Sequence, residues 1–133
     1  TRQGDLSHYN SCNVLSLHAL LGAYSDEGAQ WLDELRPVLA DNIRYACDFI
    51  AAHFPGVQVM QPQGTYMLFL DCAAWLQEHH MTLRELEERG ARAGVIWQDG
   101  AAFAWPDSIR MNLALPHSRL VEAMERLCKY AFC

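Results

Sequence analysis

Arg110 has the setting in this sequence that best suits the binding of a carboxylate. It stands between Ile109 and Met111 where apolar and polar residues alternate, so Arg110 and Asn112 face away from the apolar side of a predicted strand. A guanidinium held on a strand presents parallel N–H groups that match the two oxygens of a carboxylate. The pattern alone fits a solvated arginine on an exposed sheet face more simply.

Gly64-Thr65-Tyr66 forms a second candidate site. Gly64 precedes a predicted strand, Tyr66 to Asp71, that is apolar on both faces and should therefore be central and covered. Glycine at such a position allows the backbone to come close to a ligand. An ordinary turn glycine explains the same residues more simply.

The histidines and cysteines do not form a recognisable metal or nucleophile site. His79 and His80 are adjacent in the sequence, so their side chains diverge on a strand or on a helix. The five cysteines contain no CxxC pair, and we interpret them as reduced, small apolar residues of a cytoplasmic protein. No signal-peptide pattern, glycine-rich phosphate loop or GxSxG motif occurs, and the acidic pairs are typical of solvated helix positions.

The composition indicates one globular domain and argues against several functions. The sequence has 133 residues, of which 51% are hydrophobic and 20% charged, enough for a core. The net charge is −6 with scattered basic residues, so we expect no nucleic-acid partner, and the apolar runs are too short for a membrane span. Nine of the ten basic residues are arginine. The single lysine, Lys129, lies on the exposed side of a predicted terminal helix, so chemistry that needs a central lysine is not expected of this chain alone.

The periodicity of apolar residues predicts an α+β domain over residues 13–133, after a flexible lead-in over residues 1–12. We expect a small, mainly antiparallel sheet covered by helices. The expected helices are a largely buried one over 11–24, a long one from Ser25 to His53 with a kink at Pro37, one with a capping box of Thr82 and Glu85, and a last one capped by Ser118. The expected strands are 57–60, 66–71, 95–97 and 108–115.

Three segments together resemble a known family over about residues 10–132. They are Gly28-Ala29-Gln30-Trp31-Leu32-Asp33-Glu34-Leu35 with Asn42 in the same helix, Pro62-Gln63-Gly64-Thr65-Tyr66-Met67-Leu68-Phe69-Leu70-Asp71, and Ile109-Arg110-Met111-Asn112-Leu113-Ala114-Leu115-Pro116. Their order and spacing resemble the C-terminal part of fold-type I pyridoxal-phosphate (PLP) enzymes. Within these they resemble aminotransferases of class I/II, and more narrowly the MalY/PatB-type cystathionine β-lyases, which are C–S lyases.

This resemblance implies a role for the chain within a larger enzyme. Such enzymes have a large domain that holds PLP and its Schiff-base lysine, and a small domain built mostly from the C-terminal residues. Arg110 matches the family arginine that binds the substrate α-carboxylate, with Gly64, Tyr66 and Asn112 as further substrate-pocket candidates. The resemblance thus implies an amino-acid substrate, a homodimeric parent in the cytoplasm, and a fragment that holds no cofactor and has no activity without its large domain.

The chain departs from the family pattern in one loop, and alternatives stay open. The loop before Arg110 is often rich in Gly and Phe in the family, but here it reads Trp97-Gln98-Asp99-Gly100-Ala101-Ala102-Phe103, and Phe69 replaces the usual Trp. Transamination and sulfur elimination both remain open. A stand-alone, non-catalytic binding domain derived from the same fold is the alternative function, and an upstream reading frame with a lysine would distinguish the two. A PLP-independent α+β enzyme would need its own acid–base pair, and the sequence suggests none.

Overall fold

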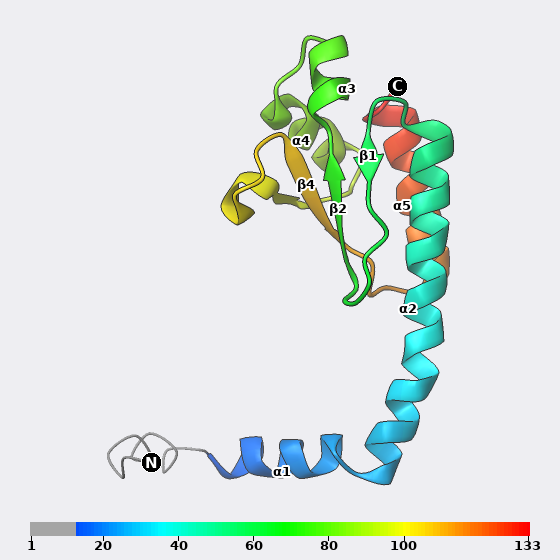
Figure 1. Ribbon diagram of the computed structural model, residues 1–133, viewed down its shortest axis with the longest axis vertical. Helices are drawn as coiled ribbons and strands as arrows, with labels where there is room; N and C mark the ends of the chain where they lie inside the picture. Colours follow the sequence, from blue (N-terminus) through cyan, green and yellow to red (C-terminus); the bar gives the residue numbers. More distant parts are fainter. Residues whose placement is uncertain (1–12) are drawn as a thin grey trace. The chain divides into compact units, whose positions relative to one another are not determined.

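A computed structural model describes residues 13–133 of the chain, which divides into two compact units (Figure 1). The first unit ends at Pro37, and the second comprises Val38–Cys133. The expected flexible lead-in over residues 1–12 lies outside the described residues. Among residues 13–133, no helix combines the length and the apolar character that crossing a bilayer requires.

The first unit contains helix α1, Val14–Ala23, and the start of the next helix. Asn13 caps α1, because its side-chain oxygen accepts a hydrogen bond from the Ser16 N–H at 2.8 Å. The expectation that this helix is largely buried is wrong, since none of its residues is buried and Leu15 is 81% exposed. Its apolar residues surround the helix, and burial needs a packing partner that the described residues do not supply.

Helix α2, Asp26–His53, is the long helix that the sequence predicts. Ser25 accepts a hydrogen bond from the Gly28 N–H at 3.2 Å, and two acidic residues occupy the first turn. The helix continues through Pro37, and the expected kink there stays a prediction. Its buried residues all follow Pro37 and lie on one side of the helix: Asn42, Ile43, Ala46 and Ile50.

The second unit is built on a four-stranded antiparallel sheet. The strands, in spatial order, are β1 (Gln58–Val59), β2 (Met67–Asp71), β4 (Ser108–Asn112) and β3 (Gln98–Asp99). The predicted strand over 95–97 is wrong, because β3 begins at Gln98. Trp97 is only 9% exposed, and its ring lies so close to Gly90 that a Cβ there would be 2.2 Å from it. Trp97 therefore packs in the core rather than in the sheet, whereas Ile96 of the same run is 88% exposed.

Helices cover one face of this sheet. Alternate residues of the central strands, among them Leu68, Leu70 and Ile109, are fully buried in the core. The second half of α2 and helix α5, His117–Tyr130, run side by side along the sheet (Figure 1) and contribute to the same core. Two further helices, α3 (Ala73–Glu78) and α4 (Leu83–Arg92), connect β2 to β3. The fold class is α+β with a small antiparallel sheet, as the sequence predicts.

The helix caps were predicted with mixed success. Thr82 and Glu85 form the expected capping box at the start of α4. Ser118 does not cap α5, because the helix begins at His117 and the capping residue is Pro116, which makes no side-chain hydrogen bond. Proline at this position sets the backbone angle at φ −55°, which directs the chain into the helix without a side-chain acceptor.

Candidate functional site

The candidate site lies on the sheet face that is turned away from the helices. Arg110 lies in the middle of β4, directly opposite Phe69 of β2 on one side and Gln98 of β3 on the other. Residues that face each other in an antiparallel pair place their side chains on the same face. The three side chains therefore share one face, and Arg110 is half-buried there, as its central strand position implies.

Two neighbours hold the guanidinium of Arg110. Its Nε donates a hydrogen bond of 2.8 Å to Oε1 of Gln98, and its Nη2 donates a second bond to the same oxygen. The ring of Phe103 lies against one face of the guanidinium, with 3.9 Å between Cζ and the ring centroid. A cation over an aromatic face at this distance is attracted by the ring's electrons. The guanidinium is thus fixed at one edge and on one face.

Three aromatic rings form the surroundings of Arg110. The ring of Phe103 meets Phe69 edge to face with centroids 5.7 Å apart, and the ring of Trp105 stacks on Phe69 at 5.9 Å. Phe103 ends a short 3-10 helix, η2 (Gly100–Phe103), in the segment between β3 and β4. Strand β2 lies inside the sheet, as predicted, but aromatic rings rather than helices contact this face of it.

The segment between β3 and β4, which carries Phe103 and Trp105, packs closely against the start of β4. Oδ1 of Asp99 accepts a hydrogen bond from the Ala101 N–H at 2.7 Å, which starts η2. The buried Ser108 hydroxyl donates to the carbonyl of Trp105 at 2.7 Å. A Cβ on Gly100 would lie 1.8 Å from the Ser108 Oγ, so glycine is required for this close approach.

Arg110 carries a charge that no described carboxylate balances. Eight of the nine arginines lie in the described part of the chain. Six of these eight have a carboxylate oxygen within 4.0 Å, and the two without one are Arg89 and Arg110. The oxygen atom that Arg110 contacts belongs to a neutral amide. Because its partner is neutral, the half-buried guanidinium keeps its full positive charge and can bind an anion.

The other predicted site residues form no hydrogen bond with Arg110, and the strand pairing places only Asn112 on its face. Asn112 follows on the same face of β4 and pairs with Met67, the residue after Tyr66. Its Oδ1 accepts a hydrogen bond from the Ala114 N–H at 2.8 Å, and Tyr66 is 40% exposed. A Cβ on Gly64 would meet nothing within 4 Å, so the fold itself does not require glycine there.

Asn42 of α2 holds the residues that follow β4 by hydrogen bonds. Its buried side-chain amide donates to the carbonyls of Leu113 and Leu115, both at 2.9 Å, and its Oδ1 lies 2.9 Å from Nδ1 of His117. Since Oδ1 can only accept, Nδ1 of His117 carries the proton. Asn42 could have been singled out from the sequence, because it is a polar residue on the apolar face of a long helix. No comparable feature of the sequence singles out Gln98 or Phe103.

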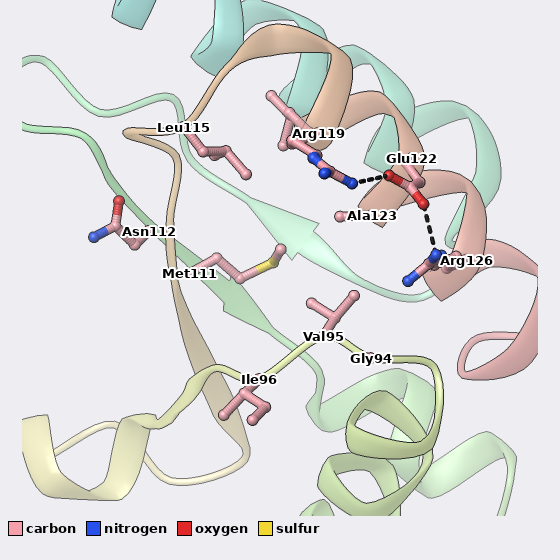
Figure 2. Close-up of a pocket in the computed structure, with 11 residues that line it drawn as sticks. Gly94, Val95, Ile96, Met111, Asn112, Leu115, Arg119, Glu122, Ala123 and Arg126 are labelled. Atoms are coloured by element: carbon pink, nitrogen blue, oxygen red, sulfur yellow. Dashed lines mark hydrogen bonds and ion pairs between the residues drawn. The ribbon is translucent and has the colours of Figure 1, made fainter.

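A surface hollow of about 320 Å³ lies between α5 and the segment 94–96 (Figure 2). Figure 2 shows Arg119 and Arg126 on either side of Glu122, whose carboxylate oxygens lie 3.0 and 2.5 Å from the two guanidiniums. Arg110 does not line this hollow. The two arginines there share the carboxylate of Glu122, whereas no carboxylate of the described residues pairs with Arg110.

Two possible nucleophiles, Cys72 and Lys129, are both held in their protonated forms. Burial, with a smaller effect of the Asp71 and Asp107 carboxylates, raises the pKa of the Cys72 thiol to about 12, so the thiolate is scarce at neutral pH. A hydrogen bond with Tyr130 raises the pKa of Lys129 and keeps its exposed amine protonated. Residues 13–133 contain no group of three or more His, Cys, Asp or Glu placed to hold a metal ion. The arrangement around Arg110 suits binding rather than bond-breaking.

Comparison with known proteins gives a consistent result. The family model for aminotransferases of class I and II matches residues 4–127. Protein MalY of Escherichia coli (strain K12) is 33% identical over 122 residues, which cover 89% of this chain and 30% of MalY. Cystathionine beta-lyase PatB of Bacillus subtilis (strain 168) is 28% identical over 118 residues, covering 86% and 29% of the two chains. This chain therefore spans about a third of the length of these relatives or slightly less.

Solved structures agree with the sequence comparison. A PLP-bound protein from Clostridium difficile 630 superposes with a TM-score of 0.82 at 30% identity, over 98% of this chain and 33% of that one. Cystalysin from Treponema denticola, which contains a pyridoxal 5'-phosphate cofactor, gives a TM-score of 0.76 at 28% identity, over 88% and 29%. With the match of the family model over nearly the whole sequence, these likenesses show that the chain belongs to the aminotransferase class I and II family.

Proposed function

We propose that this chain is the C-terminal domain of a PLP-dependent aminotransferase or C–S lyase, and that Arg110 binds the α-carboxylate of its amino-acid substrate. The observation that carries the proposal is the half-buried guanidinium of Arg110, which lies on the sheet face away from the helices without a carboxylate partner. A planar guanidinium on a rigid strand holds a carboxylate in a defined orientation.

The relatives support a larger parent protein. MalY and PatB are each more than three times as long as the segment they share with this chain, and the second is named a cystathionine beta-lyase. Helix α1 supports the same view, because its exposed apolar residues need a covering surface that the described residues do not provide. We infer that the large domain of the parent supplies that surface. A homodimeric, cytoplasmic parent is part of the same proposal.

The residues of this chain do not fit PLP as its holders. The cofactor needs a lysine amine, and Lys129 is the single lysine of the sequence. That amine is exposed near the end of α5, and its raised pKa keeps it charged, whereas the neutral form is the nucleophile. PLP supplies an electron sink for carbanion chemistry, and we assign its binding to residues outside this chain. The part proposed for this domain is to bind and orient the substrate.

The orientation of the substrate follows from the way Arg110 is held. The guanidinium is fixed by Gln98 and Phe103, so a bound carboxylate takes its direction from β4 rather than from a mobile side chain. Fixing one end of a small substrate determines where its remaining bonds point, which lowers the entropic cost of reaching the reactive geometry. We propose that Gly64, Tyr66 and Asn112 line the rest of this pocket.

Replacing Arg110 in the full-length protein tests the proposal. We expect Arg110→Ala to lower kcat/KM for the amino-acid substrate by about 2–4 kcal/mol of transition-state binding, or about 30- to 1000-fold. Arg110→Lys keeps the charge but loses the planar pair of donors, so its loss should be intermediate. Arg44→Ala is the control, because Arg44 is exposed and paired with Asp41 at 2.8 Å. An unchanged kcat/KM in Arg110→Ala would disprove the assigned role.

A further inference from the structure

Gln98 contacts Arg110 through an edge that the guanidinium also uses for carboxylates. The two residues face each other in the pairing of β3 with β4, and Oε1 of Gln98 accepts hydrogen bonds from both Nε and Nη2. A guanidinium only donates hydrogen bonds, so the atom that faces it must be the amide oxygen and not the amide nitrogen. Gln98 therefore has a fixed orientation as well as a fixed position.

This contact leaves one two-donor edge of Arg110 for a ligand. The Nε/Nη2 edge is taken by Gln98, and the ring of Phe103 covers one face of the group. The edge formed by Nη1 and Nη2 has no partner among the described residues. A carboxylate that binds with both oxygens must therefore approach in the plane of the guanidinium, at its terminal edge.

The partner of Arg110 is the neutral amide of Gln98, so the contact leaves the positive charge of the guanidinium unbalanced. Arg119 and Arg126 provide the contrast, because both guanidiniums pair with the charged carboxylate of Glu122. Gln98 supplies the same kind of acceptor oxygen without a negative charge. The adjacent Asp99 is occupied elsewhere, since its Oδ1 accepts a hydrogen bond from the Ala101 N–H. Arg110 is thus oriented while its positive charge is retained.

We propose that Gln98 is a positioning residue for the carboxylate site: its amide oxygen takes the Nε/Nη2 edge of Arg110 and reserves the Nη1/Nη2 edge for the substrate carboxylate. The inference rests on the proposed function of Arg110. It adds the direction from which the carboxylate binds and a residue that sets this direction without touching the substrate.

The test compares an amino-acid substrate with the matching amine that lacks the α-carboxylate, in the full-length protein. The measured quantity is the ratio of their two kcat/KM values. We expect Gln98→Leu to lower this ratio about tenfold, because the guanidinium loses its orienting acceptor, and Gln98→Glu to lower it further, because the new carboxylate competes with the substrate. Both losses should appear mainly in KM for the amino acid. The same substitutions at Gln58, in the other edge strand, are the matched controls and should leave the ratio unchanged.

The possible outcomes separate the two claims. A purely structural defect at position 98 would lower kcat/KM for both substrates equally, and an unchanged ratio in Gln98→Glu would overturn the inference. A higher ratio in Gln98→Leu would also overturn it, because Gln98 would then be a competitor of the substrate. If Arg110→Ala lowers the ratio and the Gln98 variants do not, only the inference fails. If Arg110→Ala leaves the ratio unchanged, the proposed function fails and the inference with it.

Discussion

At the scale of single residues, Arg110 shows what alternation along a strand can and cannot reveal. Alternation correctly places Arg110 on the face opposite Ile109 and Met111. It gives no information about Gln98 and Phe103, which stand 12 and 7 residues earlier in the sequence and reach Arg110 by strand pairing and by the turn of η2. Such contacts depend on register, and register is a property of two strands together.

Cys72 offers a prediction on pH at the same scale. Its thiol is fully buried, and burial raises the pKa from an ordinary 9.0 to about 12. In the unfolded chain the thiol loses its proton near pH 9, whereas the folded chain retains it, so the stabilisation is complete below pH 9 and is lost as the pH rises towards 12. We expect the free energy of unfolding to fall by about 1 kcal/mol more between about pH 8 and pH 10 than it does in Cys72→Ala.

Urea denaturation of the chain and its variant at several pH values measures this difference. Cys133→Ala serves as the control, because Cys133 is exposed and its substitution should leave the pH dependence as it is. Equal pH dependence in Cys72→Ala and the unaltered chain would contradict the assigned burial of the Cys72 thiol.

At the scale of elements, the two predicted helix caps differ in outcome for a local reason. The capping box of α4 needs only residues 82 to 85: the Thr82 Oγ1 accepts from the Glu85 N–H at 3.3 Å, and a Glu85 carboxylate oxygen accepts from the Thr82 N–H at 2.8 Å. These hydrogen bonds hold the pKa of Glu85 below its usual value. The start of α5 is instead set by Pro116 and by Asn42, which holds the preceding carbonyl of Leu115.

The two helix starts give a matched pair of substitutions. We expect Thr82→Ala to lower the free energy of unfolding by about 1 kcal/mol, because the first turn of α4 loses a side-chain acceptor. Ser118→Ala should change it by less than about 0.5 kcal/mol, since Ser118 lies inside α5 and not at its cap. Chemical denaturation of both variants measures the difference. Equal losses in the two would contradict the assignment of Pro116 as the capping residue.

At the scale of the whole molecule, the chain consists of two units with different degrees of burial. The described core cluster starts at Ile43 and ends at Phe132, so its members all belong to the second unit. Helix α1 of the first unit buries none of its residues and exposes large apolar side chains. Exposed apolar surface of this kind promotes association between copies.

Removal of residues 1–37 tests this division. We expect the chain 38–133 to keep its helices and to unfold in one cooperative transition with a Tm close to that of the whole chain, because the core cluster is intact. We also expect it to associate less than the complete chain of 133 residues, since the apolar surface of α1 is gone. Circular dichroism with thermal denaturation and sedimentation velocity measure the two effects. A non-cooperative or unfolded product would show that the first unit contributes to the core.

Local sequence patterns were sufficient for most of the elements and for the family. The sequence predicted the long helix α2, the strand β2, the capping box of Thr82 and Glu85, and the face on which Arg110 lies. Each of these depends on residues a few positions apart, whose types and spacing can be read from the sequence. The tertiary structure alone showed that α1 is exposed, that Trp97 belongs to the core, and that Gln98 and Phe103 hold Arg110. The reason is physical: burial and hydrogen bonding between distant residues depend on which surfaces meet, and a one-dimensional pattern does not specify that meeting.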